Sequence, residues 1–363
     1  MERRAWQFLG IEVPIIQAPM AGADSVALAR AVAKAGGLGS LACPLLTPEQ
    51  MRQVVRDFRD GWSKPLNLNF FCHKMVSPSA EAVDRWKRAL RPHYERLALD
   101  IDSVAAPRLR MPFDEEACRV VEDLSPEIVS FHFGLPDSVL LERLKRKKVK
   151  ILASATSVRE AKWLEERGCD AVIAQGLEAG GHRGMFLEEE LASQTGLFAL
   201  LPQIVDAVRV PVIAAGGIVD ARGIVAGLVL GASAVQIGTA YLKCPEAKIS
   251  PLYRKALESL GDGDTVITNL FSGRPARGIA NRFVRESGPM SDDALIFPFA
   301  ATYVTPLRAA SEKARSTDYM QMWAGQGAAL AKPMPAEELT KTLWDGAKKI
   351  LGPTIGAIDS GRF

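Results

Sequence analysis

The sequence lacks the cysteine patterns of a disulfide framework or a zinc site. Its five cysteines, Cys43, Cys72, Cys118, Cys169 and Cys244, are scattered along 363 residues and form no CxxC pair. An odd number of isolated cysteines argues against paired disulfides. We therefore expect free thiols and a reducing compartment, with the cytoplasm as the default location.

Long apolar runs and strong charge asymmetry are also missing. No stretch reaches the ~18 uncharged apolar residues of a spanning helix, and the N-terminus has no apolar region of signal-peptide length. The 45 basic and 42 acidic residues leave a net charge of +3, and the one basic run, Arg143–Lys150, reads as a solvated helix end. These absences argue against a nucleic-acid or membrane partner.

Several familiar catalytic motifs are absent. No GxGxxG follows the first strand, which argues against a Rossmann dinucleotide site, and no GxxxxGK[ST] loop is present. The four histidines form no HExxH or other metal-ligand spacing, and no serine lies in GxSxG. We predict no metal site.

What the sequence does contain is a repeated alternation of short apolar runs with amphipathic stretches. With 48% hydrophobic residues and a mean hydropathy of +0.04, the chain can bury a full core. Short β-branched runs followed by helices are typical of parallel strands covered on both faces, and eight of them predict an α/β fold, a (β/α)8 TIM barrel. The eight runs are Val13–Met20, Gly37–Ala42, Pro65–Phe70, Ile128–Phe133, Val149–Ala153, Ala171–Gln175, Pro211–Ala215 and Ala234–Ile237.

Capping residues predict the helices between these runs, and two segments exceed a minimal barrel. The first is 72–124, with expected helices at 80–90 and 114–124; the second is 242–334, expected to be a smaller, mostly helical inserted domain. We expect residues 1–241 to form the barrel and 335–363 to return to it as a C-terminal helix. The predicted capped helices are Ser25–Ala35, Thr47–Phe58, Ser157–Arg167 and Ala221–Leu230.

The most informative segment is Ala171–Phe186, in which a buried strand ends at Gln175 and a glycine-rich loop follows. This loop places His182 after Gly180 and Gly181. Glycine permits positive φ and close approach of the backbone to a ligand, and this loop would lie on the catalytic face of a barrel. A tight turn with a solvated histidine is the alternative.

Two further turns predict a phosphate site. Ala215, Gly216 and Gly217 follow the seventh strand, and Gln236–Thr239 ends the eighth. In many barrels a phosphate lies between these two loops, bound by backbone N–H groups. Ordinary βα turns are the alternative.

The first strand ends in Gln17–Gly22, whose small residues offer a flat backbone surface for an aromatic ring. Asn69 ends the third strand, where its amide can hydrogen-bond ring heteroatoms or simply cap the strand. Together these loops predict a phosphate-binding site and a flat, glycine-lined surface for an aromatic ring.

The ordered set of motifs resembles class I of the nitronate monooxygenases, formerly called 2-nitropropane dioxygenases. The likeness spans nearly the whole chain. Its motifs are QAPMAG at 17–22, AGGLGS at 35–40, NLNFF at 67–71, SFHFG at 130–134, AQGLEAGGHRG at 174–184, PVIAAGGI at 211–218, GASAVQIGTAYL at 231–242 and WAGQG at 323–327.

The resemblance implies FMN as cofactor, without a metal, and a role for each matching residue. His182 would be the active-site histidine, with His132 a second pocket histidine and Tyr94 and Tyr253 as pocket tyrosines. The family often shows Tyr-Pro where this chain has Phe297–Pro298, which leaves the substrate preference open. The implied FMN contacts are Pro19, Met20, Ala21, Asn69, Gln175, Gly180, Gly181, Ala215, Gly216, Gly217, Gln236, Ile237, Gly238 and Thr239.

The implied reaction is oxidation of an alkyl nitronate, or a nitroalkane, by O2 to a carbonyl compound and nitrite. The main alternative is an NAD(P)H-dependent FMN reductase, of the enoyl-acyl-carrier-protein reductase or quinone reductase type, on the same barrel. An IMP-dehydrogenase-like barrel needs a loop cysteine, which neither Cys169 nor Cys244 supplies, and a flavin-storage module would not need His182. Both a monomer and a homodimer are open, and Arg274 and Arg277 are expected to anchor the insert rather than bind an anion.

Overall fold

The computed structural model describes residues 5–105 and 109–352, so the last part of the segment predicted at 335–363 lies outside the described residues. All eight predicted strands are present, in one parallel sheet of order β1-β9-β8-β6-β5-β4-β3-β2. A parallel bridge from Ile16 to Leu38 joins β1 to β2 and closes the sheet, which confirms the (β/α)8 barrel. The strands are β1 Ile15–Gln17, β2 Gly39–Ala42, β3 Leu66–Phe71, β4 Ile128–His132, β5 Lys150–Ala155, β6 Ala171–Gln175, β8 Val212–Ala215 and β9 Ala234–Ile237.

The predicted helices form where their caps indicated. Ser25 accepts a hydrogen bond from Leu28 N at the start of α1, Ser157 caps α6, and Thr47 forms a capping box with Gln50. The helices around the barrel are α1 Val26–Lys34, α2 Pro48–Arg59, α4 Glu115–Leu124, α5 Ser138–Arg146, α6 Val158–Glu166, α7 Leu197–Ala207, α8 Ala221–Val229, α9 Thr239–Leu242 and α13 Ala336–Leu351. Since α13 packs against α8 and α1, the chain returns to the barrel after the insert.

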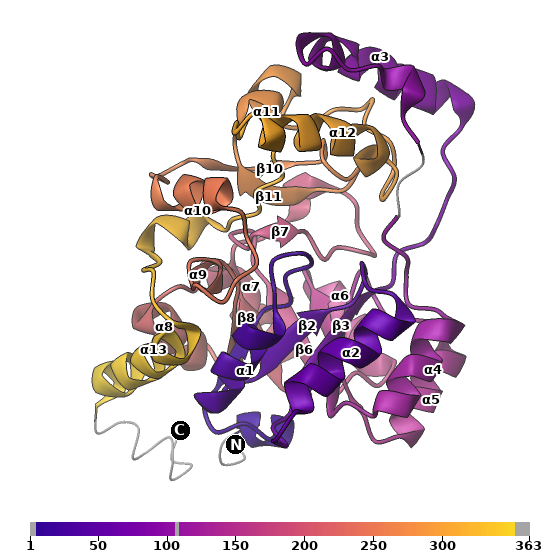
Figure 1. Cartoon of the computed structure of the whole chain (residues 1–363). Coiled ribbons are helices and arrows are strands. Elements are labelled where there is room, and N and C mark those ends of the chain that lie inside the picture. Colours follow the sequence, from indigo (N-terminus) through magenta and orange to yellow (C-terminus); the bar gives the residue numbers. More distant parts are fainter. Residues whose placement is uncertain (1–4, 106–108, 353–363) are drawn as a thin grey trace.

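The insert lies over one end of the barrel and contains strands as well as helices (Figure 1). Strands β10 Thr265–Thr268 and β11 Ala276–Ile279 pair with β7 Gly181–His182 in a three-stranded antiparallel sheet. These strands are short, and β7 lies far along the chain from its partner β11, so no local pattern marked the sheet. The helices of the insert are α10 Pro251–Glu258, α11 Arg282–Ser287 and α12 Ala300–Lys313, and the 3-10 turns of the chain are η1 Ala5–Leu9, η2 Ile101–Ser103, η3 Leu191–Ser193 and η4 Gln326–Leu330.

Helix α3 Ala80–Arg96, from the long segment between β3 and β4, packs on the insert rather than on the barrel. Trp86 and Leu90 of α3 share a buried cluster with Val304 and Leu307 of α12. The smaller body above the barrel is therefore built from two segments of the chain.

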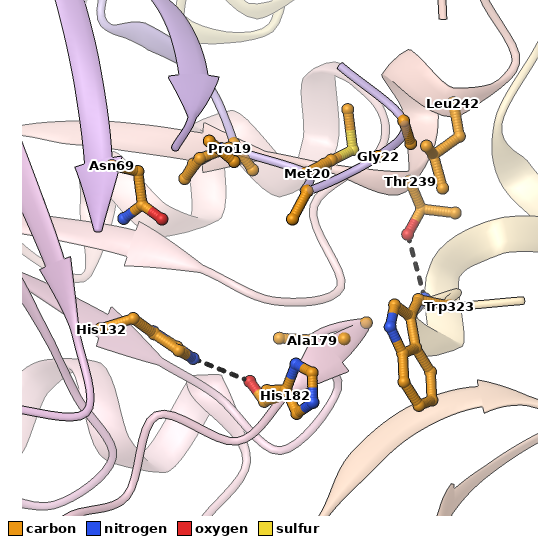
Figure 2. Close-up of a pocket in the computed structure, with 18 of the residues that line it drawn as sticks. Pro19, Met20, Gly22, Asn69, His132, Ala179, His182, Thr239, Leu242 and Trp323 are labelled. Atoms are coloured by element: carbon orange, nitrogen blue, oxygen red, sulfur yellow. Dashed lines mark hydrogen bonds between the residues drawn. The ribbon is translucent and has the colours of Figure 1, made fainter. Parts of the chain in front are cut away.

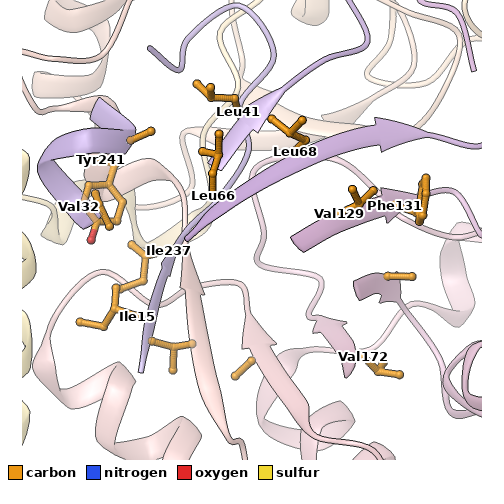
Figure 3. Packing of buried hydrophobic residues seen from close by; sticks show 14 of the residues in the cluster. Ile15, Val32, Leu41, Leu66, Leu68, Val129, Phe131, Val172, Ile237 and Tyr241 are labelled. Carbon is orange, nitrogen blue, oxygen red and sulfur yellow. The ribbon is translucent and has the colours of Figure 1, made fainter. Parts of the chain in front are cut away.

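Alternation along the strands divides the barrel core into two layers. Ile15 points toward the surrounding helices, where it shares a cluster with Val32 and Tyr241 (Figure 3). The adjacent Ile16 points into the barrel, where it clusters with Leu152 and Ile213. Successive side chains of a strand face opposite sides of a sheet, so both faces here are apolar. Among the described residues, no helix combines the length and apolarity needed to cross a membrane.

Candidate functional site

A cavity of about 300 Å³ lies at the carboxyl ends of the barrel strands, beneath the insert. His182 lies between His132 and Trp323 and faces Pro19 and Met20 across this space (Figure 2). The carboxyl-terminal end of a barrel is where catalytic loops gather. The site therefore draws on β1, β3, β4, β6, β8, β9 and the insert.

The structure brings nearly all of the predicted site residues into this one cavity. Its lining includes His182, His132, Tyr253, Pro19, Met20, Ala21, Asn69, Gln175, Gly180, Gly181, Ala215, Gly216, Gly217, Gln236, Gly238 and Thr239.

The side chains of two predicted site residues, Ile237 and Tyr94, lie elsewhere. Ile237 follows Gln236 on β9 and points outward to the helices, as strand alternation requires. Tyr94 is buried in α3, where its hydroxyl donates to Tyr303 O at 2.6 Å. A tyrosine in the insert core packs and bonds there without reaching the cavity.

The turns after β8 and β9 present backbone donors to the cavity. Within the part of the chain that the structure describes, the N–H groups of Gly180, Gly216, Gly217 and Gly238 donate to no protein acceptor. Gly216 and Gly217 have φ of 123° and 68°, which favour glycine over residues with a Cβ. Unbonded amide donors that line one cavity can hold an anion, as a phosphate site would require.

The insert packs against the loop after β6 through a glycine contact. A Cβ on Gly180 would lie 2.6 Å from Gly325 N and 2.7 Å from Ala324 C, so the two backbones touch only because residue 180 is glycine. Gly325 N also donates to Thr239 Oγ1 at 3.0 Å. These contacts place Trp323 beside His182, with ring centroids 5.5 Å apart.

The backbone of His182 is clamped by two neighbouring side chains. Gln175 Nε2 and His132 Nε2 both donate to His182 O, at 3.0 Å and 3.1 Å. Gln175 Oε1 in turn accepts from Gly184 N at 2.7 Å. The loop that carries the histidine is thus tied to β4 and β6 on both sides of the ring.

The neighbouring Arg183 also holds the loop that carries His182, through hydrogen bonds to the end of β6. Its fully buried guanidinium donates to Gly176 O at 2.7 Å and Gln175 O at 2.9 Å, and also to Gln194 Oε1. Burial and the charge of Arg277 lower the pKa of Arg183 to about 10, so the side chain stays charged at neutral pH. Buried carbonyl groups need donors, and Arg183 supplies them.

The imidazole of His182 lies in an aromatic setting with one polar partner. Its Nε2 is 2.8 Å from Ser272 Oγ, and its ring centroid is 5.3 Å from that of Phe297 and 6.1 Å from that of Phe71. Burial, followed by the charge of Arg110, holds the pKa of His182 well below 6.5. The ring is therefore neutral at physiological pH.

His132 is also neutral, and its partners fix its tautomer. A carbonyl only accepts, so Nε2 carries the proton that is donated to His182 O, and Nδ1 accepts from Ser154 Oγ at 3.0 Å. Burial lowers the pKa of His132 to about 4. His132 acts here as a support for the backbone of His182.

The first-strand loop and Asn69 complete the other wall. Asp24 accepts from Met20 N at 3.1 Å and from Ala42 N at 2.8 Å, which ties the Pro19–Gly22 loop to β2. Burial raises the pKa of Asp24 to about 7. Asn69 Nδ2 donates to Ser130 Oγ at 3.0 Å, which holds its amide at the end of β3.

Sequence reasoning missed the site residues that come from outside the barrel strands. Ser272 and Arg308 lie in the insert and Arg110 in the long segment after β3, and none of the three was predicted as a site residue. Trp323 and Gly325 lie in the WAGQG motif, but nothing local indicated that this motif meets the loop of His182. The described residues contain no group of three or more metal-ligating side chains.

Arg274 and Arg277, from the stretch SGRPARG at 272–278, both donate to backbone carbonyl groups. Arg274 donates to Met185 O and stacks over the ring of Phe133 at 4.3 Å from its centroid. Arg277 donates to Leu177 O at 3.0 Å. Both contacts tie the insert to the loop after β6, which supports the anchoring interpretation.

Comparison with known proteins agrees with this geometry. A nitronate monooxygenase family model matches residues 2–346. The chain is 42% identical to a nitronate monooxygenase of Paraburkholderia phytofirmans, covering 94% of each chain. It is 40% identical to one of Pseudomonas aeruginosa, covering 94% of this chain and 98% of the relative.

Solved structures show the same architecture. A nitroalkane oxidase from Streptomyces ansochromogenes is 36% identical, with a TM-score of 0.85 over 96% of this chain and 100% of that one. FabK from Thermotoga maritima is 27% identical, with a TM-score of 0.73 over 98% of this chain and 99% of that one. The family match, the relatives and the shared barrel agree, and the chain belongs to the nitronate monooxygenase family of oxidoreductases.

Proposed function

We propose that the protein oxidises alkyl nitronates, and nitroalkanes after their deprotonation, with O2 to carbonyl compounds and nitrite, using FMN. The observation that carries this proposal is the meeting of His182 with four unbonded glycine amides in one cavity. His182 would provide an imidazole beside the reacting carbon of the substrate, and the glycine amides would provide hydrogen-bond donors for a phosphate. The substrate is a small molecule, and no metal is required.

The residues of the cavity fit FMN. The amides of Gly180, Gly216, Gly217 and Gly238 would hold the phosphate, and the backbone of Pro19–Ala21 would lie against the ring system. Gln236 Oε1 is buried without a partner among the described residues, and a hydroxyl or ring N–H of the cofactor would satisfy it. When bound, FMN supplies the redox chemistry by taking electrons from the substrate and passing them to O2.

His182 would act as the general base toward a nitroalkane. Ser272 Oγ is 3.4 Å from Arg274 O, so its proton can go to that carbonyl while the oxygen accepts from His182 Nε2–H. In that arrangement Nδ1 holds the free lone pair and can accept the proton from the carbon beside the nitro group. A low pKa keeps this base unprotonated, and a nitronate, already deprotonated, does not need it.

The test is H182N, assayed for bound flavin and for nitrite release from ethyl nitronate and from nitroethane. We expect flavin absorbance to be retained and nitroethane turnover to fall by about 10²–10⁴-fold, the usual contribution of a general base. Turnover of the nitronate should fall much less, so the two substrates serve as internal controls. Equal losses on both substrates would contradict the assigned role, and a colourless wild-type preparation that rejects added FMN would contradict the cofactor.

An NAD(P)H-dependent flavin reductase on the same barrel is the second candidate, because the glycine turns and His182 of this cavity would serve it as well. Mixing the protein with NADH or NADPH without air distinguishes the two. Rapid bleaching of the flavin by a nicotinamide favours the reductase, and bleaching by a nitronate favours the monooxygenase.

A further inference from the structure

Arg110 is a cation of the cavity for which the described residues provide no partner. Its partly buried side chain lines the same cavity as His182. Across residues 5–105 and 109–352, its guanidinium makes no ion pair and no hydrogen bond, whereas a guanidinium has five N–H donors.

The other arginines near this end of the cavity already have partners. Arg308 Nε donates to Glu312 Oε1 at 2.9 Å, and Arg274 stacks on Phe133 and donates to Met185 O. Glu312 is the acidic residue found in the lining, and it is the one that Arg308 engages. The positive charge of Arg110 is thus not neutralised by a carboxylate of the described chain.

His73, His132 and His182 do not neutralise the charge of Arg110 either, because their rings are neutral and carry no negative charge. Burial lowers the pKa of His73 and of His132 to about 4, and burial followed by the charge of Arg110 lowers that of His182. Burial and the charge of Arg308 also lower the pKa of Arg110, yet a guanidinium remains protonated at neutral pH. The part of the cavity around Arg110 therefore carries a positive charge that the described residues do not compensate.

We propose that Arg110 is the anion-recognition residue of the substrate pocket and makes it select the anionic nitronate over the neutral nitroalkane. The assignment of the anion as a nitronate rests on the proposed function. A partly desolvated charge without a partner is costly, and an incoming anion removes that cost. A nitronate presents two oxygens in a plane, which matches the planar fork of a guanidinium for two parallel hydrogen bonds.

The same arrangement gives Arg110 and His182 separate roles. Arg110 favours the charged substrate, and neutral His182 is needed for the substrate that still carries its proton. Loss of Arg110 should therefore raise KM for the nitronate and change KM for the nitroalkane little, whereas loss of His182 lowers nitroalkane kcat.

The experiment compares the wild-type holoenzyme with R110Q and R110K, and with R119Q as a matched control. Arg119 lies on α4, with a 65% exposed side chain that pairs with Glu115. Sodium nitrate, a planar anion that is not turned over, is titrated by calorimetry, and KM is measured for ethyl nitronate and nitroethane. Flavin absorbance and the thermal midpoint of each variant are recorded alongside.

We expect R110Q to weaken nitrate binding and raise nitronate KM by at least about tenfold, as loss of a charge-assisted pair does. R110K should fall between R110Q and the wild type, and R119Q should match the wild type. Because R110Q removes an unpaired cation, its thermal midpoint should not fall.

Three results would overturn the proposal: unchanged nitrate binding in R110Q, an equal rise in KM for both substrates, or loss of flavin from R110Q, which would make Arg110 a cofactor ligand. If the wild type releases no nitrite, the proposed function fails. Nitrate binding would then still decide whether Arg110 binds anions.

Discussion

Replacing His73 with phenylalanine should make the protein less sensitive to acid. The side chain of His73 is 5% exposed, packs 4.7 Å from the ring centroid of Phe297, and has no hydrogen-bond partner for either nitrogen among the described residues. Burial, aided by the charge of Arg274, lowers its pKa from 6.5 to about 4. The folded protein therefore resists protonating this ring.

The sign of the effect follows from proton linkage. Between pH 6.5 and 4 the unfolded chain binds a proton at residue 73 that the folded chain does not, so stability falls as pH falls through this window. With these two pKa values, moving from near pH 7.5 to near pH 4.5 costs the wild type about 2.5 kcal/mol at this site. H73F removes this titrating group. On going from near pH 7.5 to near pH 4.5, its free energy of unfolding should therefore rise by about 2.5 kcal/mol relative to that of the wild type.

Urea-denaturation midpoints of the wild type and H73F at the two pH values measure this difference. Near pH 7.5 the variant should equal or exceed the wild type by up to about 1 kcal/mol, because two buried, unbonded nitrogens are lost. H73L, which adds no ring volume, controls for overpacking beside Phe297. If the midpoints of the wild type and both variants fall in parallel on acidification, His73 does not titrate as this environment requires.

Two further predictions concern packing. G180A should destabilise the protein by about 1–3 kcal/mol and weaken FMN binding, because its Cβ overlaps backbone atoms of Ala324 and Gly325. G261A is the matched control, because its Cβ would meet only Asp264 at 3.5 Å. Thermal midpoints and flavin titrations of both variants check this prediction, and equal midpoints for G180A and G261A would refute the clash. The five cysteines should resist iodoacetamide near pH 7.5 until the chain unfolds, because burial raises the pKa of each thiol. Labelling is measured by mass spectrometry, and rapid labelling of the native protein would contradict the prediction. The thiols are those of Cys43, Cys72, Cys118, Cys169 and Cys244.

The motif residues were predictable because each is tied to a strand end. Gly217 and Thr239 follow β8 and β9, and parallel barrel strands bring their carboxyl ends to one rim whatever the loops do. The same alternation turns the side chain of Ile237 away from the cavity: with Gln236 facing the cavity, the next side chain must face the helices. That period-2 rule was available from the sequence.

The surroundings of His182 were not predictable in this way. Ser272 lies 90 residues further along the chain, in a segment whose strands pair with β7 only in the folded insert. Tyr94 failed as a site residue for the same reason, because α3 crosses to the insert and buries that side chain there. Neither contact leaves a periodic or local pattern.

The sequence by itself determined the barrel, its caps and the glycine turns, because hydrophobic periodicity, capping side chains and positive φ act over a few neighbouring residues. Only the tertiary structure decided the chemistry of the imidazole: its partner Ser272, its neighbour Trp323, its low pKa and the nearby charge of Arg110. These properties arise from burial and charge summed over distant segments. They exist only once the insert has closed over the barrel.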